Sequence, residues 1–131
     1  MDSVDTSEKN KSTLVTFFNN YGRCCAKSTF KMYPPVICKD GAFMSVQAGE
    51  FYHSEPEEFL EDASMYESFE IRTELPDESI QPYRASNDFT DSDYYLYKRV
   101  GRDVIDSVIE KHWGIDTKAV DKYLSEKIDW R

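Results

Sequence analysis

Two stretches of the chain alternate between apolar and polar residues with the period of a β-strand. Residues 42–48 (AFMSVQA) place Met44 and Val46 on one face, and residues 65–72 (MYESFEIR) alternate similarly, although Glu67 interrupts their more apolar face. Because successive side chains of a strand point to opposite faces of a sheet, each stretch predicts a strand with one side turned towards a core.

A tight turn precedes the first of these strands. Asp40-Gly41 separates it from the short β-branched run at residues 36–38. Glycine tolerates the positive φ that tight turns require, so an Asp-Gly pair between two apolar runs is a strong signal for a β-hairpin. Together with the strand at residues 65–72, this hairpin predicts a small antiparallel sheet of about three strands.

The C-terminal part of the chain shows the helical period instead. Apolar residues recur every three or four positions from Val100 to Ile109, and Gly114 supplies a helix stop. Asp116 is then the expected N-cap of a second helix, and the short connection between the two helices favours a packed pair. The apolar face of the second helix consists of Val120, Tyr123, Leu124 and Ile128.

The remaining segments are less regular. Residues 1–11 are polar and predict a flexible tail. Residues 12–21 favour a short helix that begins after Ser12 and ends near Gly22, although their Thr, Val and Phe content also suits a strand. Residues 74–93 contain two prolines and several Asp, Ser and Asn residues, and they predict a long surface connection with turns.

Strands followed by helices indicate an α+β fold, with a small antiparallel sheet packed against two C-terminal helices and an N-terminal helix. A chain of 131 residues, of which 40% are hydrophobic, is enough for one core. We therefore expect a single domain over residues 1–131.

Cysteine usage and apolar content bound the class of protein. Cys24, Cys25 and Cys38 form neither a disulfide framework nor a Cys-x-x-Cys zinc motif. Free thiols, a polar N-terminus and the lack of an apolar run of about 20 residues predict a cytoplasmic protein without a membrane span. No phosphate loop, dinucleotide glycine pattern or nucleophile elbow occurs, so no cofactor is expected.

The charge of the chain is concentrated in one segment. The formal net charge is −9 at pH 7, from 25 acidic and 16 basic residues. Residues 55–78 contain ten acidic residues and one basic residue and carry −9, while residues 1–54 carry +1 and residues 79–131 carry −1. Direct binding to nucleic acid is therefore disfavoured. Such a segment can instead steer association with a basic partner, or it can form a solvated face without a partner.

We expect the partner-binding residues to lie in this acidic segment. The predicted contact residues are Glu55, Glu57, Glu58, Glu61, Asp62, Glu67, Glu70 and Tyr66. Aromatic residues are favoured in interface cores, and those among or beside the acidic residues are Tyr52, Phe59, Tyr66 and Phe69. Packing within the sheet is the alternative role for the aromatic residues. The charge pattern is also compatible with self-association through basic residues near the C-terminus.

A catalytic centre is the main alternative to a binding surface. His53 is followed by several glutamates and could act as a general base, and Cys38 would become a nucleophile if a base lowered its pKa. One Cys and one His near each other in sequence are a weak signal, and packing explains both. His112 ends the apolar stripe of a helix, where the helix dipole favours a cationic histidine. No catalytic or metal-ligating residue is assigned.

Four stretches of the sequence form a characteristic series along the chain. They are Cys38-Lys39-Asp40-Gly41-Ala42-Phe43-Met44-Ser45-Val46-Gln47-Ala48, Tyr52-His53 before Pro56, Tyr66 to Glu70, and Glu110 to Ile115. Over residues 36–115 the chain resembles a group of small proteins encoded by tailed bacteriophages, which share a C-x-D-G-x-x-M-S-V-Q-A motif. The chain departs from that group in its N-terminal extension and in an acidic insertion around residues 57–64. The resemblance implies a phage origin and a compact fold, and it carries no catalytic motif.

Small acidic phage proteins without enzyme motifs are often inhibitors of host systems. The resemblance and the acidic segment together predict an inhibitor of the anti-CRISPR or anti-restriction kind, which acts as a DNA mimic in the host cytoplasm. Its partner would be a host defence protein with a basic, nucleic-acid-binding surface. The alternatives are a small hydrolase centred on Cys38, His53 and nearby glutamates, or a structural or assembly protein of the phage particle.

Overall fold

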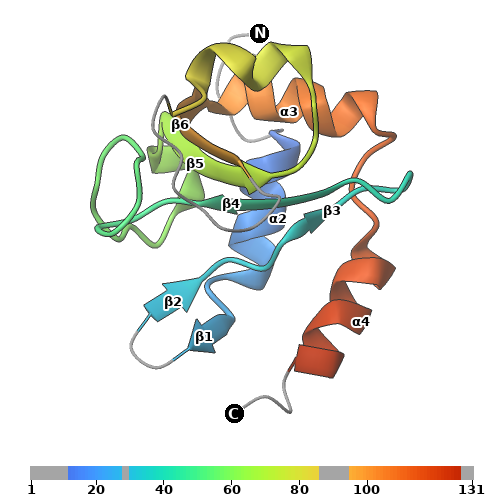
Figure 1. Cartoon of the computed structure of the whole chain (residues 1–131). Coiled ribbons are helices and arrows are strands. Elements are labelled where there is room, and N and C mark those ends of the chain that lie inside the picture. The colour runs from blue at the N-terminus through green and yellow to red at the C-terminus, as the bar shows by residue number, and fades with distance from the viewer. Residues whose placement is uncertain (1–11, 28–29, 86–94, 128–131) are drawn as a thin grey trace, which may run out of the picture.

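The structure is a computed structural model of the chain (Figure 1). It describes residues 12–27, 30–85 and 95–127. The predicted tail at residues 1–11, the end of the predicted connection, and Ile128 lie outside these ranges. The helices, 3-10 helices (η) and strands are α2 Thr13–Tyr21, β1 Cys25–Lys27, β2 Phe30–Met32, β3 Val36–Ile37, β4 Phe43–Gln47, η1 Ala63–Met65, β5 Ser68–Thr73, η2 Glu78–Tyr83, β6 Tyr95–Gly101, α3 Arg102–Lys111 and α4 Thr117–Lys127.

Four antiparallel strands form the central sheet, in the order β3-β4-β5-β6. Val46 of β4 lies opposite Ile71 of β5, which lies opposite Tyr97 of β6, and all three side chains are buried. With its helices, this sheet confirms the predicted α+β class. The sheet has one strand more than predicted, and β1 and β2 form a separate antiparallel pair that the sequence pattern did not indicate.

The boundary between β6 and α3 differs from the prediction. Val100 was expected to begin the apolar stripe of the helix. It belongs instead to the strand β6, where it lies opposite Phe69. Gly101 ends β6, and Arg102 begins α3 in the next position. Because no turn residues separate the two elements and Val100 and Val104 are four residues apart, apolar spacing alone extends the helix too far back.

The hairpin of β3 and β4 is confirmed. Cys38 N donates a hydrogen bond to Ala42 O (2.8 Å) and closes the turn. Within the turn, Asp40 Oδ1 accepts a hydrogen bond from Ala42 N (3.0 Å), and Gly41 has a φ of +95°, in the region that favours glycine. Met44 is fully buried, as the alternation in this strand predicts.

Two 3-10 helices occur where the sequence pattern predicts a strand and an irregular connection. η1 occupies the start of the strand predicted at residues 65–72, so that β5 begins only at Ser68, and η2 lies within the predicted connection. Each has an aspartate N-cap, Asp62 or Asp77, whose Oδ1 accepts a hydrogen bond from the backbone N–H two residues later (2.9 and 3.0 Å). Such local bonds compete with the extended backbone that an alternating pattern indicates.

The N-terminal helix α2 confirms the preference for a helix over a strand. Ser12 is its N-cap, with Oγ accepting a hydrogen bond from Val15 N (3.2 Å), and Gly22 follows the last turn with a φ of +67°. The helix buries Phe18 against the sheet, where its ring centroid lies 5.9 Å from that of Phe69. α2 therefore supplies part of the core that covers the sheet (Figure 1).

The two C-terminal helices are present, but they do not form the predicted packed pair. Gly114, with a φ of +89°, follows α3, and Asp116 caps α4 by accepting a hydrogen bond from Ala119 N (3.1 Å). Between the helices the chain bonds to the end of β3, because Lys39 N donates to Gly114 O (3.0 Å) and Asp116 N donates to Ile37 O (2.8 Å). This pairing directs α4 away from α3 and against β3 (Figure 1).

Loops cover both edges of the sheet. The connection from α3 to α4 lies along β3, and at the opposite edge Ala85 N donates to Leu96 O of β6 (2.9 Å). Arg84 also forms a bridge with Tyr97 there. Exposed strand edges are the usual template for pairing with another chain, so these positions leave little edge backbone for a partner to use.

Candidate partner-binding loop

The segment that carries the net charge folds in part into one long loop. We call residues 49–67 the acidic loop; they follow β4, include η1 and project from one side of the sheet (Figure 1, green, left). Gly49 N donates to Ser54 Oγ (3.1 Å), and Glu67 N donates to Glu55 O (2.8 Å). These bonds close the loop on itself and hold its two ends near the sheet.

Arg23, which precedes β1, links the acidic loop to the body of the protein. Its guanidinium donates hydrogen bonds to Leu60 O and Ala48 O (both 2.9 Å). The same group donates to Tyr66 Oη (2.8 Å) and lies 4.5 Å from the centroid of the Tyr33 ring. Charge-assisted hydrogen bonds and a cation–π contact of this kind stabilise the loop in one conformation.

Tyr66 lies inside the acidic loop and not on its surface, which corrects its predicted role as a contact residue. The side chain is fully buried. Its hydroxyl donates to Glu58 O and accepts hydrogen bonds from Leu60 N (2.8 Å) and Arg23 Nη2. One donor and two acceptor sites are the full capacity of a hydroxyl, so Tyr66 holds the loop together and offers nothing to a partner.

Glu70 is the second correction to the predicted contact residues. It lies on β5 and is only 3% exposed. One carboxylate oxygen accepts a hydrogen bond from His53 N (3.0 Å), and the other pairs with Arg72 Nε (3.3 Å). Strand alternation places Glu70 on the face opposite Phe69, but the acidic loop returns over that position, and this return is a tertiary event that no local pattern indicates.

The other six predicted carboxylates are exposed. Three of them also make contacts within the protein, which are Glu55 with Ser68 Oγ (2.9 Å), Glu57 with Arg99 Nη2 (3.0 Å) and Asp62 with Asn19 Nδ2 (3.1 Å). The remaining three have no ion pair among the described residues and are Glu58, Glu61 and Glu67. These last three are the carboxylates most available to a cationic partner.

Two exposed aromatic rings lie among these carboxylates. Phe51 is 60% exposed and Phe59 is 40% exposed, and their ring centroids are 5.8 Å apart in an edge-to-face arrangement. Phe59 is held from below, because a Cβ on Gly49 would come within 2.4 Å of its ring and the Arg23 guanidinium lies 5.0 Å from its centroid. Exposed rings in fixed positions are typical anchors of protein interfaces. Phe51 was not predicted, since a single loop residue contributes to no periodic pattern.

The structure separates the two residues of the alternative catalytic centre. Cys38 is 1% exposed beside β3, and burial raises the pKa of its thiol to about 11. His53 lies near the opposite edge of the sheet, where its carbonyl accepts a hydrogen bond from Arg99 N of β6 (3.0 Å). With neighbouring strands about 4.8 Å apart, three strand spacings, roughly 14 Å, lie between them. A buried thiol with a raised pKa stays protonated at neutral pH and is not an activated nucleophile.

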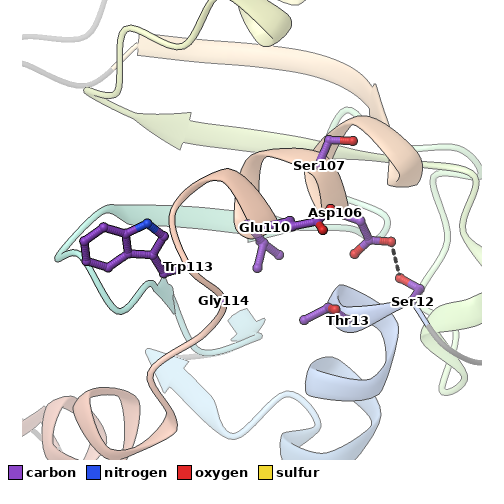
Figure 2. Close-up of a pocket in the computed structure, with 8 residues that line it drawn as sticks. Ser12, Thr13, Asp106, Ser107, Glu110, Trp113 and Gly114 are labelled. Carbon is purple, nitrogen blue, oxygen red and sulfur yellow. Dashed lines mark hydrogen bonds between the residues drawn. The ribbon is translucent and has the colours of Figure 1, made fainter.

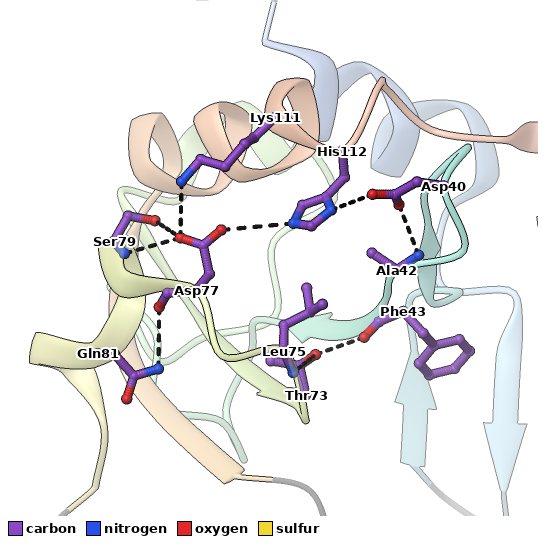
Figure 3. Close-up of polar contacts among 10 residues, drawn as sticks. All are labelled: Asp40, Ala42, Phe43, Thr73, Leu75, Asp77, Ser79, Gln81, Lys111 and His112. Atoms are coloured by element: carbon purple, nitrogen blue, oxygen red, sulfur yellow. Dashed lines mark hydrogen bonds and ion pairs between the residues drawn. The ribbon is translucent and has the colours of Figure 1, made fainter.

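A polar network surrounds His112 at the end of α3 (Figure 3). Its Nδ1 lies 2.6 Å from Asp40 Oδ2, and its Nε2 lies 3.7 Å from Asp77 Oδ2. Asp77 also accepts hydrogen bonds from Ser79 Oγ (2.5 Å) and Lys111 Nζ (3.2 Å). Because Ser79 donates to a carboxylate and not to the imidazole, this is not the arrangement of an activated serine. The network joins α3 to the hairpin turn and to η2.

The two carboxylates of this network have lowered pKa values. The hydrogen bond with His112 lowers the pKa of Asp40. Burial opposes the ionisation of Asp77, but hydrogen bonds from Ser79 and Lys111 outweigh burial and lower its pKa. His112 was predicted at a helix end, whereas its two partners come from segments distant in sequence.

Two further observations limit the chemistry of the described residues. Across residues 12–27, 30–85 and 95–127, no three or more His, Cys, Asp or Glu side chains come together in a way that could hold a metal ion. None of the helices in those ranges combines the length and apolar character that crossing a bilayer requires.

No family model, curated protein or solved structure matches the chain.

Proposed function

We propose that this protein is a bacteriophage inhibitor that binds a basic, nucleic-acid-handling host defence protein through the acidic loop. The partner is of the CRISPR or restriction kind, and binding occurs in the host cytoplasm, where the loop takes the place of DNA or RNA. The observation that carries this proposal is that the acidic loop contains seven acidic residues, all of them exposed, and no lysine or arginine.

The fixed conformation of the loop supports this proposal. Arg23 and Tyr66 hold the loop before any partner arrives, so little conformational entropy remains to be lost on binding. The exposed carboxylates would accelerate encounter with a basic groove, and this acceleration should weaken as salt screens the charges. Phe51 and Phe59 add an apolar contact that a purely solvated acidic face would not need.

The test uses two charge-matched variants of the full chain as immobilised bait in host-cell lysate. The loop variant carries Glu58→Lys, Glu61→Lys and Glu67→Lys; these side chains are exposed, and the bonds that Glu58 and Glu67 make within the loop come from backbone atoms, which the substitutions keep. The control variant carries Glu74→Lys, Glu78→Lys and Glu126→Lys, three exposed residues outside the loop. Each triple change raises the formal net charge by 6, from −9 to −3.

Mass spectrometry identifies the captured proteins, and capture is repeated with double-stranded DNA as competitor. We expect the wild type and the control variant to retain a basic, nucleic-acid-handling protein that the loop variant loses and that DNA displaces. Equal capture by both variants would exclude the loop as the docking site. A captured protein that DNA does not displace would exclude nucleic-acid mimicry.

A further inference from the structure

A groove lies on a part of the molecule remote from the acidic loop, between the start of α2 and the end of α3 (Figure 2). Its volume is about 530 Å³. In Figure 1 the end of α3 lies on the side opposite the acidic loop, and the loop contributes no residue to the groove. The groove therefore belongs to neither the proposed docking site nor the His112 network.

Trp113 is the most exposed large apolar side chain of the described residues, at 70%. Its φ of +76° lies in the region that favours glycine. The backbone holds it there, because Trp113 N donates to Glu110 O (3.0 Å) and Gly114 N donates to Ile109 O (2.9 Å). The indole is thus presented to solvent by a fixed backbone at one end of the groove.

Two carboxylates line the groove, and they differ in their contacts within the protein. The oxygens of Asp106 accept hydrogen bonds from Ser12 Oγ (2.7 Å) and Leu14 N (2.9 Å) at the start of α2. Glu110 is exposed and makes no ion pair with any residue in the described ranges. No basic residue lines the groove. In Figure 2 the Glu110 side chain points towards Asp106 inside the groove, and the Trp113 indole lies apart from it at the end of the groove.

We propose that this groove binds a cationic peptide segment, with one arginine side chain placed against the Trp113 indole and a second arginine paired with Glu110. The face of an indole attracts cations more strongly than other aromatic side chains do. A guanidinium is planar and weakly hydrated, so it stacks on aromatic rings better than an ammonium does. The groove between the two helices gives the peptide backbone a place to lie. This inference does not depend on the function proposed for the acidic loop.

Lys39 provides an internal check on the charge argument. Its Nζ ends 4.0 Å from the position that a Cβ on Gly114 would take, beside the groove. A cationic ligand on Trp113 is repelled by this ammonium. Lys39→Gln should therefore tighten binding by about twofold, whereas an anionic ligand would bind more weakly to the same variant.

The experiment measures tryptophan emission in the full chain carrying Trp130→Phe, which leaves Trp113 as the sole tryptophan. The probe is acetyl-Gly-Arg-Gly-Arg-Gly-amide, and the control peptide has citrulline in place of both arginines. We expect a saturable change with the arginine peptide and binding at least about fivefold weaker with citrulline. Glu110→Gln should weaken binding by about fivefold, and Glu126→Gln should leave it unchanged.

Calorimetry with Trp113→Gly, a change that suits the positive φ, should show loss of binding in a protein that unfolds as cooperatively as the wild type. No saturable change up to about 10 mM peptide would overturn the proposal. Equal binding of both peptides, or unchanged binding to Glu110→Gln, would also overturn it. The loop variant with Glu58, Glu61 and Glu67 reversed should bind the arginine peptide normally, so failure here and failure of the proposed function are separate results.

Discussion

Replacing Tyr66 with phenylalanine removes one oxygen atom from the centre of the acidic loop. The ring is fully buried and stays in place, so the substitution leaves almost no cavity. Three hydrogen bonds are lost, those with Glu58 O, Leu60 N and Arg23 Nη2. Tyr97→Phe is a matched control, because Tyr97 is also buried, but among the described residues its hydroxyl makes one hydrogen bond, which it accepts from Gln81 Nε2 (3.2 Å).

The expected magnitude follows from the number and type of these bonds. A neutral hydrogen bond contributes about 0.5–1.5 kcal/mol net, and a bond to a charged group contributes about 1.5–3 kcal/mol. Arg23 keeps its two carbonyl acceptors after the substitution, and Leu60 is only partly buried. We therefore expect Tyr66→Phe to lower the free energy of unfolding by about 2–4 kcal/mol, and Tyr97→Phe to lower it by about 0.5–1 kcal/mol.

Urea denaturation measures this difference. With an m-value of roughly 1.5 kcal/mol/M, the midpoint for Tyr66→Phe should fall by about 1.3–2.7 M. Hydrogen exchange gives a local readout, because the Leu60 amide loses its acceptor and should exchange at least about tenfold faster relative to core amides. Equal destabilisation by the two substitutions, or an unchanged Leu60 amide, would refute the reasoning that Tyr66 holds the loop.

Three further predictions concern backbone, pH and thiol chemistry. Gly49→Ala would place a Cβ 2.4 Å from the Phe59 ring and should lower the free energy of unfolding by about 2–3 kcal/mol. Gly41→Ala has nothing within 4 Å of its new Cβ and should lower the free energy of unfolding by about 1 kcal/mol, the cost of its positive φ. Urea midpoints compare the two variants. The lowered pKa of Asp77 means that this carboxylate contributes stability that is complete above its unfolded pKa of about 3.9 and is lost as pH falls through the lower folded value. Urea midpoints of Asp77→Asn should therefore fall less steeply than those of the wild type between about pH 5 and pH 2. With a pKa of about 11 and 1% exposure, the thiol of Cys38 should resist iodoacetamide at neutral pH under conditions that modify the exposed Cys24, and peptide mapping would detect either outcome.

The features predicted correctly depend on residues close together in the chain. Asp40 and Gly41 form their turn through bonds that span two to four residues. Ser12 and Asp116 cap helices by accepting hydrogen bonds from the backbone N–H three residues later in the chain. Such interactions form whatever surrounds them, so the order of these elements and the α+β class could be inferred before any contact was known.

The predictions that failed had two equally good local solutions. Val100 suits the end of a strand as well as the first turn of a helix, and only its pairing with Phe69 decides between them. The turn at Gly114 predicts that α3 stops but not where α4 goes. That direction depends on hydrogen bonds from this connection to the end of β3, more than seventy residues away in the sequence.

The hairpin, the helix caps and the concentration of negative charge between residues 55 and 78 follow from the order of the amino acids alone. Charge is a sum over residues and needs no fold, so it could be located without coordinates. Which of those residues face solvent depends on the folded chain. Tyr66 is buried because Arg23, 43 residues away, reaches its hydroxyl, and Glu70 is buried because His53 folds back over β5. Burial depends on which distant segments meet, and no local pattern contains that information.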